Sequence, residues 1–436
     1  MDANVSVKKK AGSASARTTL WQWVAVAVLS LSTFVVVTSE MLPVGVLTPM
    51  ADGLHISSGR AGFSLTITGL VTAVTAPLVV RMVGGLDRRA VLAAAMVVLA
   101  VGNALTTAAD DFGLLVVSRV VVGVGMGAVW GLASAVAARL VAPRKVALAV
   151  SCTIGGVAAA SVIGVPLGTV VGNAFGWRTA FAALSAAAVA LAVGLLLALP
   201  RLPRPAASGD VDHPTRREPL LRTAPVTVGL VLIVFLVTAH FAAYTYVRPV
   251  LEERVGSTPG AISLLLLVYG LFGLIGNFVA GASAARRARG TVLGLTTGIG
   301  AGIALLAVFG SVTAVAGVGI ALWGLAYGGL SVAGQIWMAQ AAPERIEHIT
   351  GIYVGVFTAA IALGAFLGGV VVETAGITHL LWSATALAGA ALAVGVFGPG
   401  PSGPSGLSGR ARRVVGSAVV SEDPQGAEPR GVAVDR

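Results

Sequence analysis

Charge is scarce in this sequence, and its scarcity excludes most classes of soluble protein. Only 11% of the 436 residues are charged and 56% are hydrophobic, with a mean hydropathy of +0.92, whereas soluble domains average about 25% charged residues. The single cysteine, Cys152, excludes a disulfide framework and a cysteine-based metal site. A GxxxxGK[ST] phosphate-binding loop is also missing, so nothing indicates ATP as an energy source.

Long apolar runs recur along the whole chain instead. Each is close to the roughly 20 residues that an α-helix needs to cross a bilayer core of about 30 Å. The runs lie at about 22–50, 62–83, 90–109, 112–138, 146–172, 178–199, 225–247, 260–283, 291–310, 314–338, 350–372 and 379–397. The sequence therefore predicts an all-α membrane protein with twelve transmembrane helices.

The few charges that are present are unevenly distributed. If the N-terminus is cytoplasmic, 24 of the 29 lysines and arginines fall in tails and loops on the cytoplasmic side. This asymmetry is the positive-inside rule, which orients a multi-pass protein of the plasma or inner membrane with both termini cytoplasmic. The net charge of +11 is thus a signal of topology, and we expect no nucleic-acid partner.

Polar segments divide the chain into two halves. A charged, proline-containing linker at 201–224 separates a six-helix bundle at 21–200 from a second one at 225–397. Residues 1–20 form a cytoplasmic tail, and the segment 398–436 lacks apolar periodicity, so we expect it to be disordered.

An internal repeat connects the two halves. At an offset of 200 residues, VTSE (37–40) corresponds to VTAH (237–240), and Gly164 and Gly168 correspond to Gly364 and Gly368. Repeat halves related by an axis along the membrane normal are typical of transporters that bind their substrate near the bilayer midplane, between the halves.

Four blocks carry a resemblance to a known family. They are TSEMLPVGVLTPMADGL (38–54), LVVSRVVVGVGMG (115–127), IGVPLGTVVG (163–172) and HFAAYTYVRP (240–249). Together they resemble the major facilitator superfamily in its twelve-spanner drug/proton antiporter branch, with similarity to sugar-efflux and purine-ribonucleoside-efflux members. The resemblance implies two pseudo-symmetric six-helix halves and transport by alternating access.

The resemblance also indicates residues that control the conformational change. In RMVGGLDRRAVL (81–92), Arg88 and Arg89 match the basic pair after the second helix, but Gly84 stands where the family has an aspartate. Gly123 belongs to the fourth-helix motif. The fifth-helix antiporter motif, whose proposed role is to seal and bend the helix, comprises Gly164, Pro166, Gly168 and Gly172.

One carboxyl group interrupts the first apolar run. Glu40 is the acidic residue that we place well inside a span, about 15 Å below an outer end near Met50. A charge at the centre of a helix costs about 2.5–3.5 kcal/mol on insertion scales, which makes such a residue a functional candidate by default. We interpret Glu40 as a proton carrier; the alternative is a structural acid kept neutral by hydrogen bonds between helices.

Two further ionisable residues lie within spans. Arg119, always charged and at a depth similar to that of Glu40, is the expected counterpart of Glu40; the resemblance gives it a role in proton coupling, and a structural anchor is the alternative. His240 occupies the position of Glu40 in the repeat, and histidine changes charge near neutral pH. We therefore predict that Glu40 and His240 face each other at one titratable site; otherwise His240 is a packing residue.

Other polar or aromatic residues on the spans are candidates for contact with a substrate. They are Trp130, Tyr244, Tyr246, Asn277, Trp323, Gln335 and Tyr353. Each of them has an alternative role in helix packing, and Tyr244 and Tyr246 have a second one as membrane-interface anchors.

These features predict a proton-coupled secondary efflux transporter that needs no metal or cofactor beyond the proton gradient. Its resemblance implies a monomer in the lipid bilayer that exports a small organic solute such as a sugar, a purine ribonucleoside or a drug like chloramphenicol. A proton-independent facilitator or importer of a sugar or nucleoside is an alternative, as is a receptor without transport activity. An intramembrane enzyme is disfavoured, because one Glu, one His and one Cys are dispersed over three spans.

Overall fold

The computed structural model describes residues 18–82, 86–202 and 222–401, and within them every regular element is helical. The first half contains α1 (Leu20–Gly45), α2 (Leu47–Gly53), α3 (Ser58–Met82), α4 (Arg88–Thr107), α5 (Phe112–Leu140), α6 (Val146–Ala159), α7 (Val165–Phe175) and α8 (Trp177–Ala198). The second half contains α9 (Ala224–Tyr244), α10 (Val247–Val255), α11 (Pro259–Phe309), α12 (Thr313–Ala341) and α13 (Ile346–Phe397). Gly84, most of the predicted linker and most of both predicted tails lie outside the described residues.

The twelve predicted spans correspond to ten helices long and apolar enough to cross a membrane among the described residues. The difference arises because α11 and α13, with 51 and 52 residues, each contain two predicted spans around a non-helical residue, Arg287 and Gly376 respectively. A straight helix of 51 residues would be about 75 Å long. Arg254 of α10 instead donates to the Ala307 carbonyl near the far end of α11 (2.5 Å), so the chain reverses within α11.

The predicted first span, 22–50, is wrong at its end. The α1 helix stops at Gly45 and α2 follows at an angle set by Val46, whose φ and ψ are −120° and 20°. The seventh span, predicted to run to 247, likewise ends at Tyr244, and Tyr246 has φ and ψ of −106° and 18°. Glu40 therefore lies five residues, about 8 Å, before the end of its helix, and not about 15 Å below it.

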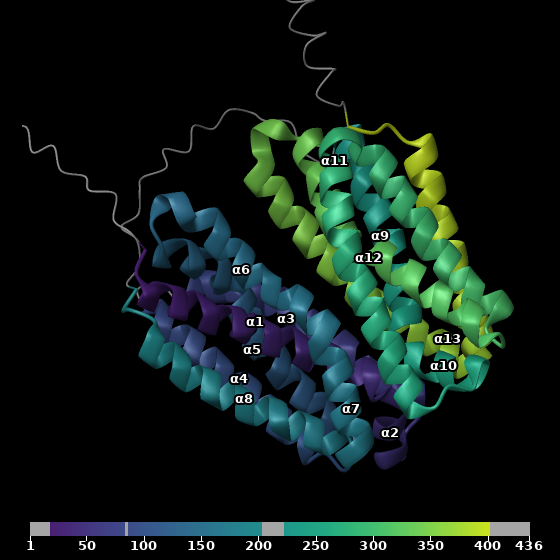
Figure 1. The fold of residues 1–436 in the computed structure, drawn as a ribbon, viewed down its shortest axis with the longest axis horizontal. Coiled ribbons are helices and arrows are strands. Elements are labelled where there is room, and N and C mark those ends of the chain that lie inside the picture. The colour runs from purple at the N-terminus through teal and green to yellow at the C-terminus, as the bar shows by residue number, and fades with distance from the viewer. Residues whose placement is uncertain (1–17, 83–85, 203–221, 402–436) are drawn as a thin grey trace, which may run out of the picture.

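Figure 1 shows the helices arranged as two bundles, α1–α8 and α9–α13, which lie side by side where α2 and α10 are and diverge away from them. We call this region the α2–α10 end. Hydrogen bonds between the described residues of the two halves join Thr48 to Glu252, Ser57 to Glu373, Thr66 to Ala362, Asn173 to Pro259 and Ser263, Tyr246 to Gly59, and Arg248 to Gly45 and Asn173. All lie between the α2–α10 end and the middle of the spans.

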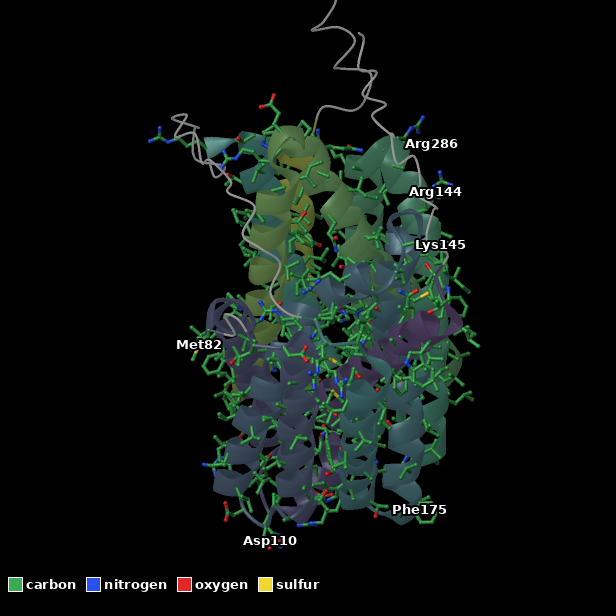
Figure 2. The ribbon with its side chains drawn as sticks, turned by 90° about the vertical axis from the view of Figure 1, so that its left-hand side faces the viewer. Met82, Asp110, Arg144, Lys145, Phe175 and Arg286 are labelled. Carbon is green, nitrogen blue, oxygen red and sulfur yellow. The ribbon has the colours of Figure 1, made fainter. Side chains whose placement is uncertain are left out.

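Basic loop residues gather toward one end of the molecule. Figure 2 shows Arg144, Lys145 and Arg286 toward one end, and Asp110 and Phe175 at the other. The arginines and lysine belong to the loops that the charge asymmetry assigns to the cytoplasmic side.

The internal repeat governs helix packing. A Cβ added to Gly168 would lie 2.6 Å from Leu42 of α1, and one added to Gly368 would lie 2.7 Å from the Ala242 carbonyl of α9. Positions 42 and 242, like 168 and 368, are 200 residues apart, so the same contact occurs in both halves. Gly176 and Gly376 add to the correspondence, with φ of 87° and 81° at equivalent turns, where the left-handed backbone favours glycine.

Candidate functional site

The Glu40 carboxyl lies at the boundary between the two halves. Val37, Met41 and Val44 belong to a hydrophobic cluster that continues from the first half into the second, so this face of α1 lies where the halves meet. Glu40 shares the face by helical spacing and is only 7% exposed. No hydrogen-bond donor among the described residues reaches its carboxyl group, but it interacts electrostatically with the Tyr327 hydroxyl of α12. The site thus pairs an acid from one half with an aromatic residue from the other.

Arg119 is fully buried inside the first half and does not pair with Glu40, contrary to the sequence-based expectation. Its guanidinium donates to the Ser39 carbonyl (3.2 Å) and to the Thr106 hydroxyl (3.0 Å), and it lies over the Phe181 ring at 4.8 Å. The physical reason is helix geometry, because Ser39 lies about 100° around α1 from Glu40 and is turned into the first half.

Pro43 explains why a carbonyl of α1 is available to Arg119. Proline has no backbone N–H, so Pro43 cannot donate to the carbonyl of residue 39, four positions earlier. Arg119 provides the missing donor to the Ser39 carbonyl. Asn103 of α4 binds the Ser39 side chain as well (3.0 Å). Arg119, which the sequence suggested as the partner of one acid, is therefore part of a polar network across α1, α4 and α5.

His240 is buried in the second half, and its hydrogen bonds define its protonation state in this conformation. Trp323 Nε1 donates to His240 Nδ1 at 2.9 Å. Because an indole can only donate, Nδ1 carries no proton and the ring is neutral, with its Nε2 proton near the Tyr269 hydroxyl at 3.5 Å. Protonation of Nδ1 requires Trp323 to move away.

A stack of rings surrounds His240. The Tyr327 ring lies parallel to the imidazole with centroids 3.6 Å apart and an interplanar angle of 3°. Tyr244 lies 5.2 Å from His240 on the same helix, and Tyr269 of α11 lies 4.8 Å from Tyr244. Trp323 meets His240 edge-on at 5.5 Å. The structure thus brings together the sequence candidates His240, Tyr244 and Trp323.

Tyr269 and Tyr327 are members of this stack that the sequence analysis missed. All five tyrosines of the chain lie in its second half, and that clustering was a signal available from composition. Tyr327 also follows Trp323 by one helical turn, which places both side chains on one face of α12.

The remaining substrate candidates are placed differently. Tyr353 is buried, and its hydroxyl donates to the Ser331 carbonyl (3.4 Å). Tyr246 is also buried and donates to the Ala365 carbonyl (3.1 Å) at the contact between the halves, so neither Tyr244 nor Tyr246 is an interfacial anchor. The structure does not bring the other three candidates to the ring stack: Trp130 is 39% exposed on α5, Asn277 is half-buried on α11, and Gln335 is exposed on α12.

Arg248 joins the two halves at the α2–α10 end. It is 4% exposed and donates to Glu252 on its own helix (2.8 Å), to the Gly45 carbonyl at the end of α1 (2.6 Å) and to Asn173 of α7 (3.0 Å). Glu252 in turn accepts a hydrogen bond from Thr48 of α2 (2.5 Å). This ion pair of α10, whose Glu252 is 26% exposed, therefore binds the first half a short distance beyond Glu40.

The motif residues have mainly structural contacts in this conformation. Arg89 donates to the Leu199 carbonyl (3.2 Å), and Asp87 caps α4 by accepting from the Arg89 amide; Arg88 precedes it at the first position of α4. A Cβ on Gly123 would lie 2.9 Å from the Thr68 carbonyl, so glycine allows the close approach of α3 and α5. Before Pro166, residues 160–164 form a π-helical turn, and prolines and π-helical turns are both places where helices kink.

The fifth-helix glycines pack on the helix that carries Glu40. Gly164 faces Thr38, Gly168 faces Leu42 and Gly172 faces Val46. Thr38 and Leu42 are four residues apart on one face of α1, and Val46 follows at the bend after that helix. The fifth-helix motif therefore packs closely against the helix that carries Glu40.

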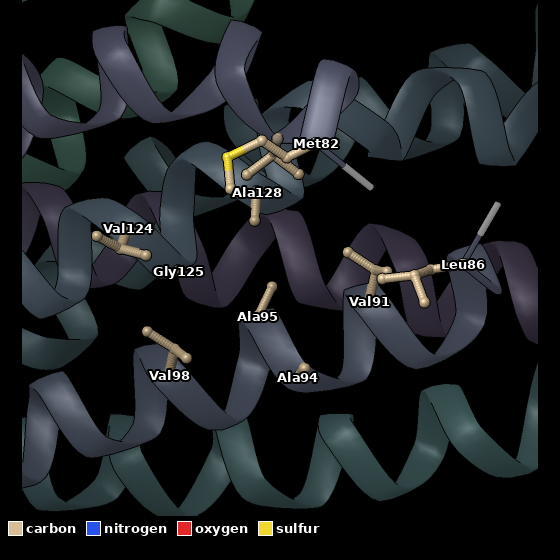
Figure 3. Close-up of a pocket in the computed structure, with 10 residues that line it drawn as sticks. Met82, Leu86, Val91, Ala94, Ala95, Val98, Val124, Gly125 and Ala128 are labelled. Atoms are coloured by element: carbon tan, nitrogen blue, oxygen red, sulfur yellow. The ribbon is translucent and has the colours of Figure 1, made fainter. Parts of the chain in front are cut away.

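An apolar cavity of about 330 Å³ lies elsewhere, between α3, α4 and α5. Figure 3 shows its lining, which includes Met82, Leu86, Val91, Val98 and Val124. It contains neither Glu40 nor any member of the ring stack, and its hydrocarbon lining offers no group to orient a polar solute. The ring stack and Glu40 are therefore the better candidate site.

Comparisons with known proteins agree with this architecture. The family model of the Major Facilitator Superfamily matches residues 29–256 and 230–429. The chain is 32% identical over 361 residues to the purine ribonucleoside efflux pump NepI of Escherichia coli O6:K15:H31 (strain 536), covering 82% of this chain and 90% of that protein. It is 31% identical over 375 residues to the purine ribonucleoside efflux pump NepI of Shigella sonnei (strain Ss046), covering 85% and 93%.

Solved structures show the same fold at lower identity. The nucleoside transporter NupG matches with a TM-score of 0.69 and 13% identity, over 86% of this chain and 98% of that one. A bacterial homolog of the human lysosomal transporter Spinster matches with a TM-score of 0.63 and 16% identity, over 87% and 95%.

Proposed function

The chain belongs to the Major Facilitator Superfamily, and on that premise we propose that it is a proton-coupled antiporter that exports a small organic solute. Two matched relatives are named purine ribonucleoside efflux pumps, which favours a nucleoside among the solutes that the sequence suggested. The proposal places the protein in the cell membrane with both termini cytoplasmic. The halves are then in contact at the outer side and apart at the cytoplasmic side.

The observation that carries the proposal is the unpartnered Glu40 carboxyl between the halves. Buried polar groups in proteins are nearly always hydrogen-bonded, so a buried acid without a donor among the described residues is poised to exchange a proton or to bind a solute. Protonation removes a charge whose burial in a membrane costs about 2.5–3.5 kcal/mol. A carboxyl that accepts either a proton or a hydroxyl group of the solute would couple their movements in opposite directions.

Arg119 and His240 take supporting roles in this proposal. Arg119 holds the Ser39 carbonyl next to Glu40 and so fixes the segment of α1 that carries the acid. His240 becomes available to a proton only in a conformation in which the Trp323 bond is broken. Glu40 is thus the first proton carrier, and His240 is a second one that depends on movement of α12.

Alternating access requires the contact at the α2–α10 end to open. Hinge-like or rocking motion of rigid halves around a central site is the usual mechanism for repeat transporters. Gly164, Gly168 and Gly172 link α7 to α1, so rearrangement of that contact would change the surroundings of Glu40.

Purified protein in liposomes tests this function. A pH gradient is imposed, adenosine, D-ribose and chloramphenicol are added separately, and dissipation of the gradient is followed with a pH-sensitive dye. We expect solute-dependent proton movement for at least one of the three. Uptake of labelled solute that is indifferent to the pH gradient would replace antiport with the alternative, a proton-independent facilitator or importer.

A further inference from the structure

The rings around His240 form a wall rather than a random aromatic cluster. Tyr327 and His240 are parallel at 3.6 Å, and Tyr244 and Tyr269 are within 27° of parallel at 4.8 Å. Trp323 stands nearly perpendicular to Tyr244 and Tyr269, with interplanar angles of 88° and 84°. Its indole N–H also binds His240, so the wall is held in place from α9, α11 and α12.

One surface of this wall is turned toward the first half. Tyr327 is half-buried, whereas Trp323, one helical turn earlier, is fully buried. His240 covers one face of the Tyr327 ring, and the Tyr327 hydroxyl is within electrostatic reach of Glu40. Tyr327, which also contacts Phe241 and Tyr269 at its sides, therefore has its hydroxyl end near the boundary between the halves.

Three polar groups near this surface make no side-chain hydrogen bond to the described residues. They are the Glu40 carboxyl, the Tyr244 hydroxyl and the Tyr327 hydroxyl. Glu40 is 7% and Tyr244 is 6% exposed. The Tyr244 and Tyr327 hydroxyls interact electrostatically with each other, so the three groups gather in one region. Their oxygens are not among the fully enclosed polar atoms that lack a partner, so they border space that water or a ligand can fill.

A flat aromatic surface beside the Glu40 carboxyl and the Tyr244 and Tyr327 hydroxyls limits the kinds of solute that can bind there. An aliphatic sugar has hydroxyls for Glu40 but no π-face, and an apolar drug has a ring but nothing for the carboxyl. A nucleoside has both, because its base can stack and its ribose hydroxyls can donate. We propose that a nucleoside binds here, with its base stacked on Tyr327 and its ribose directed to Glu40 and Tyr244. This inference rests on the proposed function and names the solute and the residues that select it.

Binding to purified full-length protein in detergent tests the proposal without any transport step. Titration calorimetry compares adenosine, uridine and D-ribose on the wild type, Tyr327→Leu and Tyr327→Phe. Base–aromatic stacking predicts that Tyr327→Leu weakens adenosine binding by roughly 5- to 150-fold, whereas Tyr327→Phe keeps the ring and loses less. D-ribose should bind the wild type far more weakly than adenosine.

Two further variants separate a local effect from loss of folding. Phe278→Leu removes a ring that is 70% exposed on α11 and should bind adenosine like the wild type. Tyr244→Phe retains its ring but lacks an unpartnered hydroxyl, and should weaken adenosine binding by about 2- to 10-fold. Unchanged adenosine binding by Tyr327→Leu, no adenosine binding by the wild type, or D-ribose binding as tight as adenosine would each overturn the proposal.

The binding experiment and the antiport experiment can fail separately. If the wild type binds adenosine through Tyr327 but liposomes show no solute-dependent proton movement, the site stands and the antiport fails. If protons exchange for a solute without an aromatic ring and Tyr327→Leu exchanges normally, the antiport stands and this site fails.

Discussion

Removal of the Arg248 side chain should open the α2–α10 end. The Arg248 guanidinium is buried and makes three short hydrogen bonds, two of them to the first half at Gly45 and Asn173. Glu252 is 26% exposed, so the loss is reckoned from the two bonds across the halves: a hydrogen bond of a charged group contributes about 1.5–3 kcal/mol, and losing both costs about 3–6 kcal/mol. Since Glu252 would remain near Thr48 without its cation, Arg248→Ala destabilises this conformation relative to one in which the end is open, where Glu252 can be hydrated.

The magnitude follows from the same figures. A change of about 3–6 kcal/mol corresponds to a shift of roughly two to four orders of magnitude in the ratio of the two conformations. We expect Arg248→Ala to convert a population with the α2–α10 end closed into one with a substantial open fraction.

Distances between spin labels measure that population. With Cys152 replaced by serine, labels at Asp52→Cys and Glu253→Cys, both exposed, report the α2–α10 end, and labels at Arg144→Cys and Glu344→Cys report the opposite end. Arg248→Ala should lengthen the first distance and shorten the second.

Arg254 provides a matched control on the same helix. It donates only within the second half, to Ala307 and Thr378, so Arg254→Ala should leave both distance distributions unchanged. If the Arg248→Ala distributions equal those of the wild type, the ion pair does not hold the halves together and the reasoning is refuted.

Two other predictions concern stability and the buried arginine. Gly364→Ala should destabilise the purified protein by about 1–3 kcal/mol, because its Cβ would lie 2.6 Å from the Thr238 carbonyl. Gly355→Ala is the control, since its Cβ meets nothing within 4 Å. Equal melting temperatures of the two variants in detergent would contradict the packing argument. Arg119→Met should impair proton exchange in liposomes and lower the melting temperature, because it leaves the Ser39 carbonyl without the donor that Pro43 cannot supply, a loss of about 1–3 kcal/mol. Normal exchange by this variant would show that Arg119 is dispensable.

The sequence predicts the fold well because its signals are long and repeated. Apolar runs near 20 residues locate the spans, and the correspondence of residues 164 and 168 with 364 and 368 locates the helix contacts. The breaks after Gly45 and Tyr244 were missed, since the apolar runs continue through both. Hydropathy reports burial in the membrane and is insensitive to a local change of backbone direction.

The site is predictable only in part, because pairing depends on which face of a helix a residue occupies. Glu40 and Arg119 are at similar depth, but Ser39 and not Glu40 is turned toward Arg119. Pro43 was the available signal, as its missing N–H frees the Ser39 carbonyl. The partnership of Tyr327 with His240 joins residues 87 positions apart on α9 and α12, and no local pattern encodes such a contact.

Exchange by Glu40→Gln protein in liposomes tests the central claim most directly. The variant keeps the size of the side chain but cannot carry a proton, and Asp52→Asn, at an exposed acid of α2, serves as the control. The account predicts that Asp52→Asn couples solute export to the pH gradient as the wild type does, while Glu40→Gln exchanges labelled for unlabelled solute but no longer responds to the gradient. Undiminished transport driven by the pH gradient in Glu40→Gln would contradict it.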